Sequence, residues 1–323
     1  MSAAVAFKLL AIFAAVASGW LAMRRGWLGQ GAGGGDPARV LSNATFYLFI
    51  PALLFRTMVR LDLAALPWRT LAAYFAPALA LTLLVYAWQR RAAPGQDAAA
   101  PATRTVAAVY GNAVQLGIPL ISALFGESGL ALLIALVSMH GVVLLTLLTV
   151  LVESDLARAD PAASHAGVLR NTVRNAIVHP VVMPVLAGMA WNLTARGLHP
   201  VLDETLAVLG SAVVPVCLVL IGASLATYGV RGNVRGALQV TLLKLAVLPA
   251  LVLVVAHWGF RLAGQPLAVL VMMAALPSGS NALIFAQRYG TLQGEASTAI
   301  VVSTVAFALT ASFWLAALAW LGA

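Results

Sequence analysis

Long apolar runs separated by short polar breaks dominate the chain. A helix that crosses a bilayer needs roughly 20 mostly apolar residues, and ten segments meet that requirement. The runs are unbroken and rich in Ala and Leu, which favours helices over strands. The predicted spans cover 5–23, 38–58, 68–88, 104–125, 128–152, 171–192, 205–228, 234–258, 266–288 and 294–321. We therefore expect an all-α membrane protein with ten transmembrane helices.

Arginine residues lie mainly in the breaks, and their distribution predicts the orientation of the chain. With the N-terminus outside, the cytoplasmic loops would hold Arg24, Arg25, Arg39, Arg90, Arg91, Arg104, Arg158, Arg170, Arg174, Arg231, Arg235 and Arg288. The outer loops would hold Arg56, Arg60, Arg69, Arg196 and Arg261. Because cytoplasmic loops carry an excess of basic residues, the N-terminus is expected outside. An even number of spans places the C-terminus there too.

Composition supports this class and excludes several others. Of 323 residues, 62% are hydrophobic and 9% are charged, against about 25% charged in a soluble domain. The net charge of +9 therefore fits membrane topology rather than a nucleic-acid partner. One cysteine, Cys217, cannot form an internal disulfide. The sequence has no Walker motif, no CxxC and no metal-ligand cluster, so we expect no cofactor, no metal and no enzymatic activity.

The chain divides into two halves around its longest polar break. This break, 153–170, is a predicted cytoplasmic linker and leaves five spans on each side, in residues 1–152 and 171–323. The prolines that match between the halves are Pro51 with Pro215 in the second spans and Pro119 with Pro277 in the fourth spans. Five is odd, so the halves must enter the membrane from opposite sides. This pattern is typical of an inverted repeat, although prolines are also common in membrane helices.

The fourth span of each half carries unusual polarity. Residues 111–119 and 276–282 place Gly, Pro and carboxamide or hydroxyl groups inside apolar runs. Pro removes a backbone donor, and the freed backbone groups must face protein or a watery cavity. The half-helix N-termini so created suit an anionic ligand. The plainer alternative is a pair of kinks packed by small residues, but the amides Asn112, Gln115 and Asn281 have no packing role that explains them.

At these motifs the sequence resembles the auxin efflux carrier family, which includes plant auxin exporters and bacterial members called malonate or malate transporters. The matching stretches are 41–55, 111–120, 125–127, 221–225, 244–249, 276–282 and 286–290. The resemblance implies a 5+5 inverted-repeat fold shared with bile-acid symporters and sodium/proton antiporters, in which broken helices 4 and 9 cross. It also implies a mobile core of helices 3–5 and 8–10 and a scaffold of helices 1, 2, 6 and 7 that forms a homodimer.

The resemblance also implies a substrate-binding site at the crossover. Asn112 matches the crossover Asn that contacts auxin in the plant proteins, and His140 falls where those proteins have Gln. Asn281 takes the polar place usual in bacterial members, while the plant crossover Pro aligns with Ala282. The predicted substrate-binding residues are Asn112, Gln115, Pro119, His140, Pro277, Ser278, Ser280 and Asn281, with Lys244 as a supporting charge.

The ionisable residues limit which transport mechanisms the sequence is compatible with. All ten acidic residues lie in loops or at helix ends, which disfavours an antiporter that uses a pair of intramembrane aspartates. The interior ionisable groups are His140, His179 and Lys244. His140 is either a titrating group or a neutral hydrogen-bonding group, and His179 is expected to be structural. Lys244 is expected to neutralise carbonyl ends of the broken helix 9.

The sequence therefore predicts a secondary transporter of small organic anions that works by an elevator movement in the bacterial inner membrane. Two alternatives remain at this stage. One is a sodium-coupled symporter on the same fold, with carbonyls and amides around Asn112 and Ser280 holding Na⁺. The other is a membrane receptor that binds an anion without moving it. The expected partners are the organic anion, the lipid bilayer and a second copy of the chain.

Overall fold

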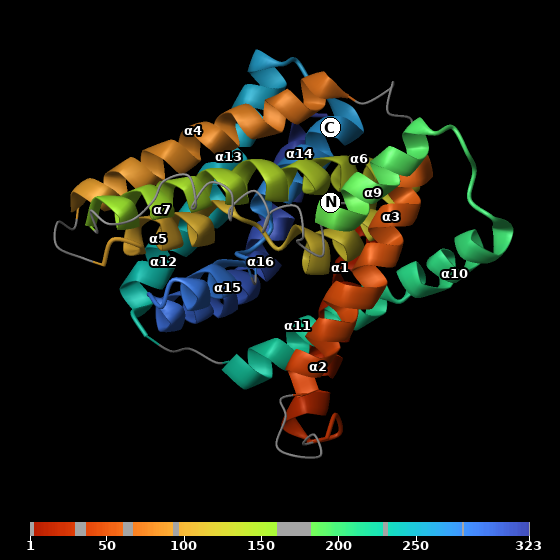
Figure 1. Ribbon diagram of the computed structural model, residues 1–323, viewed down its shortest axis with the longest axis horizontal. Coiled ribbons are helices and arrows are strands. Elements are labelled where there is room, and N and C mark those ends of the chain that lie inside the picture. The colour runs from red at the N-terminus through yellow and green to blue at the C-terminus, as the bar shows by residue number, and fades with distance from the viewer. Residues whose placement is uncertain are drawn as a thin grey trace. The chain divides into compact units, whose positions relative to one another are not determined.

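The computed structural model describes residues 3–29, 37–60, 67–92, 97–159, 182–228, 232–279 and 281–322. These residues form helices joined by short connections (Figure 1), and a single isolated β-bridge is the one strand-like pairing among them. The all-α prediction is confirmed for this part of the chain. His179 and Ser280 lie outside the described residues.

Six helices of the described residues are long and apolar enough to cross a membrane. They are Val40–Arg60, Trp68–Ala92, Ala113–Leu156, Pro200–Thr227, Val234–Gly259 and Gln293–Trp320. The third of these has 44 residues, more than twice the length that one crossing needs, and Gly126 interrupts it with non-helical angles (φ 66°, ψ −157°). This break falls between the predicted fourth and fifth spans. The structure therefore supports a helical membrane protein, and the count of ten spans stays a prediction.

The chain folds into two compact units, each built from separate stretches of sequence. Unit 1 comprises Met1–Leu66, Val114–Ser138 and Val178–Tyr228, and unit 2 comprises Pro67–Ala113, Met139–Ile177 and Gly229–Ala323. Each unit thus draws segments from both sequence halves. The division into repeats at 153–170 stays a prediction.

Unit 1 is built on close contact between helices distant in sequence. Its helices are α1 (Ala3–Arg24), α2 (Pro37–Ala44), α3 (Ile50–Arg60), α6 (Ile118–His140) as far as Ser138, α9 (Val182–Leu193), α10 (Pro200–Ser211) and α11 (Val213–Tyr228). Helix α1 packs against α11, and α3 packs against α9 and α10. A Cβ atom on Gly222 would overlap the Val16 carbonyl oxygen of α1. This contact therefore requires glycine, as is usual where membrane helices pack closely.

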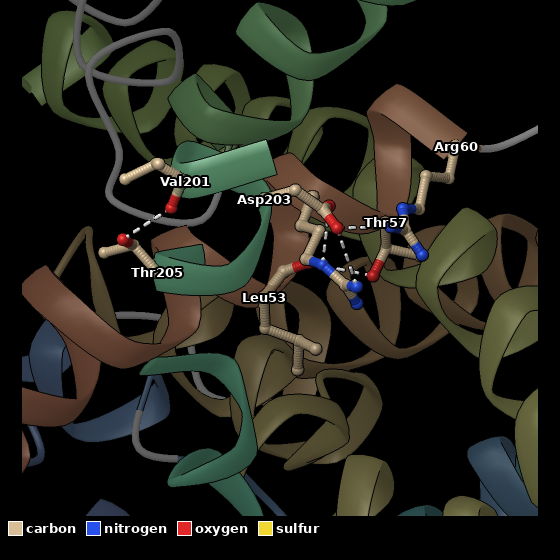
Figure 2. Close-up of polar contacts among 7 residues, drawn as sticks. Leu53, Thr57, Arg60, Val201, Asp203 and Thr205 are labelled. Atoms are coloured by element: carbon tan, nitrogen blue, oxygen red, sulfur yellow. Dashed lines mark hydrogen bonds and ion pairs between the residues drawn. The ribbon is translucent and has the colours of Figure 1, made fainter. Parts of the chain in front are cut away.

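Charged side chains join α3 to α10 within unit 1 (Figure 2). Arg56 Nε donates to Asp203 Oδ1 at 2.9 Å, and Arg60 donates to Asp203 Oδ2 at 2.5 Å. The Asn192 amide of α9 donates to the carbonyls of Met58 and Val59 at 3.1 and 2.7 Å. These carbonyls lie in the last turn of α3, where C=O groups have no N–H partner within the helix. Polar contacts therefore fix the end of α3 from two neighbouring helices.

Unit 2 surrounds one helix that is buried along most of its length. Its helices are α4 (Trp68–Ala92), α5 (Ala100–Val109), α7 (Thr146–Ala159), α12 (Val234–Leu242), α13 (Leu248–Val254), α14 (Gly264–Ala275), α15 (Asn281–Arg288) and α16 (Gln293–Trp320). Every residue of α14 from Leu267 to Ala275 is buried. A helix that is apolar on all sides is typical of such a central position, and α4, α13 and α16 pack against it.

Pairs of polar side chains connect the helix ends of unit 2. The Arg104 guanidinium donates to both carboxylate oxygens of Glu295 at 2.7 and 3.2 Å, and Asn233 donates to the same carboxylate at 3.2 Å. Burial raises the pKa of the Tyr289 hydroxyl, so this phenol stays protonated and donates to Glu153 Oε1 at 2.9 Å. Glu295 lies in the first turn of α16, at a helix end as the sequence predicts, but it is 4% exposed. Its arginine partner explains how a carboxylate is tolerated there.

Candidate functional site at the broken helices

Two interrupted helices of unit 2 meet at their breaks. Helix α5 ends at Val109, and Tyr110 then adopts extended angles (φ −89°, ψ 103°). Helix α14 ends at Ala275, and Leu276 is extended as well (φ −56°, ψ 145°). Gly111 and Ser278 form an antiparallel bridge between the two breaks. Asn112 N donates to Pro277 O at 2.8 Å, and Gly279 N donates to Tyr110 O at 3.0 Å.

Two glycines allow this close crossing. A Cβ atom on Gly279 would lie 3.0 Å from the Gly111 carbonyl oxygen and 3.3 Å from Asn112 Cα. A Cβ atom on Gly111 would lie 3.2 Å from Lys244 Cε. Because glycine has no side chain, the backbones can approach to hydrogen-bonding distance. Gly111 and Gly279, one from each polar motif, thus allow the crossing directly.

Hydroxyl groups satisfy the backbone freed by the break in the second helix. Ser278 Oγ donates to Ala107 O at 2.6 Å, which engages a carbonyl in the last turn of α5. Ser278 N donates to Ser303 Oγ of α16 at 3.1 Å. Both serines are fully buried. Several backbone N–H and C=O groups at the crossing are therefore already paired within the protein. A ligand would consequently contact side chains more than backbone groups.

Lys244 occupies the other side of the crossing. It is fully buried on a π-helical turn, η4 (Leu243–Val247), and its amino group donates to the Ala274 carbonyl in the last turn of α14. No carboxylate forms an ion pair with Lys244 among the described residues. A basic group beside the carbonyl end of a helix opposes the partial negative charge of that end.

His140 lies in a buried aromatic cluster beside the crossing. Its ring stacks on Tyr110 with 4.2 Å between ring centroids and an interplanar angle of 30°. Its Nε2 atom lies 3.3 Å from the Tyr74 hydroxyl of α4. Both neighbours are uncharged phenols. This arrangement favours the neutral hydrogen-bonding role over the titrating role for His140.

The two candidate amide residues, Asn112 and Asn281, differ in their exposure to solvent. Asn112 is 8% exposed and directly follows the bridge residue Gly111. Asn281 is partly exposed and is the first residue of α15, where helix N–H groups lack helical partners. One amide therefore follows each break.

The structure brings together six of the predicted residues in unit 2: Asn112, His140, Lys244, Pro277, Ser278 and Asn281. Gln115 and Pro119 belong to unit 1, on the π-helical turn η2 (Ala113–Gly117) and on α6, and both are buried. Ser280 lies outside the described residues.

Three residues at the crossing were absent from the sequence-based set: Tyr74, Tyr110 and Ser303. Tyr110 directly precedes the polar motif that begins at Gly111, and this position in the sequence could have placed Tyr110 among the predicted site residues. Tyr74 and Ser303 stand in ordinary apolar helices, and nothing in their local sequence distinguishes them. Their partners come from other helices, which only the fold reveals.

Comparisons with known proteins identify the family. The family model described as "Membrane transport protein" matches residues 4–315. The chain belongs to this family of membrane transport proteins. This match confirms the resemblance to the auxin efflux carriers. A curated relative from Methanothermobacter thermautotrophicus, titled "Uncharacterized transporter", is 26% identical over 314 residues, which cover 95% of this chain and 96% of that protein.

Proposed function

We propose that this family member is a secondary transporter of small organic anions, and that the anion binds where the two broken helices cross. The observation that carries the proposal is the bridged crossing of Gly111 and Ser278. In secondary transporters, discontinuous helices of matched position form the substrate site near the bilayer midplane. An irregular backbone at such depth is tolerated where protein or a watery cavity surrounds it.

The charges around the crossing support an anion rather than a cation as the substrate. Helix α15 begins at Asn281, so its partial positive end lies beside the break. The carbonyl end of α14 is engaged by the Lys244 amino group, and that of α5 by the Ser278 hydroxyl. A cation or a hydroxyl group thus engages each carbonyl end, and Asn112 and Asn281 carry amide N–H groups beside the breaks. A carboxylate is the simplest ligand for this set.

The division into two units supports an elevator movement. Unit 2 contains most of the predicted core, helices 3–5 and 8–10, and unit 1 contains most of the predicted scaffold, helices 1, 2, 6 and 7; residues 114–138 fall in unit 1 instead. In our proposal unit 2 moves relative to unit 1 and carries the anion across. The proposal includes ten spans arranged as an inverted repeat, with a homodimer formed by the scaffold helices.

Exposed tryptophans at helix ends support the proposed placement in a membrane. Trp68 begins α4, Trp258 lies in the π-helical turn η5 (Val255–Gly259), and Trp320 ends α16. All three are more than half exposed, and all three lie at helix ends assigned to the outer side. Tryptophan is enriched where membrane helices meet the interface. We propose a multi-pass protein of the bacterial inner membrane with both termini outside.

Binding measurements on purified protein test the site. Lactate, malonate and larger mono- and dicarboxylates are screened by thermal shift, since a ligand that binds the folded state raises its apparent stability. Asn112→Ala and Asn281→Ala should each weaken binding by roughly 1–3 kcal/mol, the cost of leaving a buried polar partner unpaired. The matched control is Gln239→Ala, which removes an exposed amide of α12. Normal binding by both asparagine variants would place the site elsewhere.

A further inference from the structure

Lys244 lies against both broken helices at their crossing. Its amino group donates to the Ala274 carbonyl in the last turn of α14. A Cβ atom on Gly111, the bridge residue of the other break, would lie 3.3 Å from the Lys244 nitrogen. Asn112, a candidate ligand group, is the next residue along the chain. A basic side chain therefore stands at the point where the two breaks meet.

This lysine differs from the other charged side chains buried in unit 2. Glu295 is paired with Arg104 at 2.7 Å, and Asp155 is paired with Arg90 at 3.5 Å. Lys244 is fully buried, yet in the described part of the chain no carboxylate lies within ion-pair distance of it. A buried charge without a counter-charge is costly. The carbonyl end of α14 offsets only part of this cost, since a helix end carries roughly half a charge.

The charge of a ligand at the crossing decides whether this imbalance is removed. Opposite charges attract more strongly inside a protein than in water, so a bound monoanion is attracted by Lys244 and balances its charge. An uncharged ligand leaves the ammonium unbalanced. A dianion brings a second negative charge, and Lys244 is the one buried lysine or arginine among the described residues. The charges therefore favour a ligand with a single negative charge.

We infer that Lys244 is the charge partner of the transported anion, and that it selects monocarboxylates as the substrate class. This inference rests on the proposed function, because it concerns the ligand of the same site. It goes beyond the contact between Lys244 and the α14 carbonyl. A lysine that only stabilised the crossing would affect the binding of charged and uncharged ligands alike, whereas a charge partner affects the charged ligand alone.

Ligands of one shape and different charge test the inference. Malonamide, malonamate and malonate carry zero, one and two negative charges at pH ~8, where free carboxyl groups are ionised. Lactamide and lactate form a second pair of this kind. Isothermal titration on the purified full-length protein should show that malonamate binds about tenfold or more tightly than malonamide, and lactate than lactamide. Malonate should bind more weakly than malonamate, because its second charge has no partner.

A variant without the charge completes the test. Lys244→Met keeps the length of the side chain, and replacing a buried charge by an apolar side chain of similar volume is often tolerated. It should abolish the preference for malonamate over malonamide and for lactate over lactamide. The matched control is Arg235→Met, which removes an exposed charge of α12 and should leave both preferences unchanged.

The outcomes separate the inference from the proposed function. A Lys244→Met variant that retains the wild-type preferences would overturn the inference and leave the anion site standing. Wild-type protein that binds malonate at least as tightly as malonamate would overturn it too. If Lys244→Met does not fold, the wild-type ranking of the three malonate-shaped ligands decides. If wild type binds no carboxylate of the panel, the proposed function fails first and takes the inference with it.

Discussion

At the residue scale, the two phenols beside His140 lead to a test of its role. The imidazole contacts a phenol hydroxyl and a phenol ring, and His140→Gln keeps a hydrogen-bonding group without a titratable charge. A histidine that must be charged to hold an anion would lose affinity as pH rises through the range of about 5 to 8. We expect instead that wild type and His140→Gln show the same pH profile for lactate, which stays ionised above pH ~6. Titrations from pH ~6 to ~8 check this, and a fall confined to wild type would show that His140 titrates.

At the element scale, the ion pair between α5 and α16 should stabilise unit 2. Glu295 is 4% exposed and accepts two bonds from Arg104. Glu295→Gln removes the charge that balances the Arg104 guanidinium, whose side chain is 14% exposed, so it should destabilise the protein by up to roughly 3–5 kcal/mol, the scale for a fully buried pair. Thermal melting in detergent should show a large fall for Glu295→Gln and little change for Glu204→Gln, an exposed carboxylate of α10. Replacing both Arg104 and Glu295 by Met should recover much of the loss. Equal melting of wild type and Glu295→Gln would show that the pair contributes nothing.

At the scale of the whole molecule, the sequence was informative about elements and breaks but not about their assembly. Apolar runs locate helices because the bilayer demands length and hydrophobicity, and Gly and Pro locate breaks because they weaken helical bonding. The breaks at 110–112 and 276–279 follow from these rules.

Assembly depends instead on contacts between distant segments. The two interleaved units, the aromatic cluster of Tyr74 and Tyr110 behind His140, and the burial of Glu295 all arise in this way. A single sequence does not contain the partners of these residues. The π-helical turns that carry Lys244 or directly follow His140 were also not predicted, since one extra residue in a turn hardly alters an apolar pattern.

Counterflow in liposomes is the most direct test of anion transport through the crossing. Purified protein is reconstituted into vesicles loaded with unlabelled malonate or lactate, and trace labelled anion is added outside. A transporter should accumulate label transiently in the lumen, without a sodium requirement, and Asn112→Ala should slow that accumulation while Gln239→Ala should not. Label that binds in proportion to the protein but never enters the lumen would contradict transport and indicate a receptor.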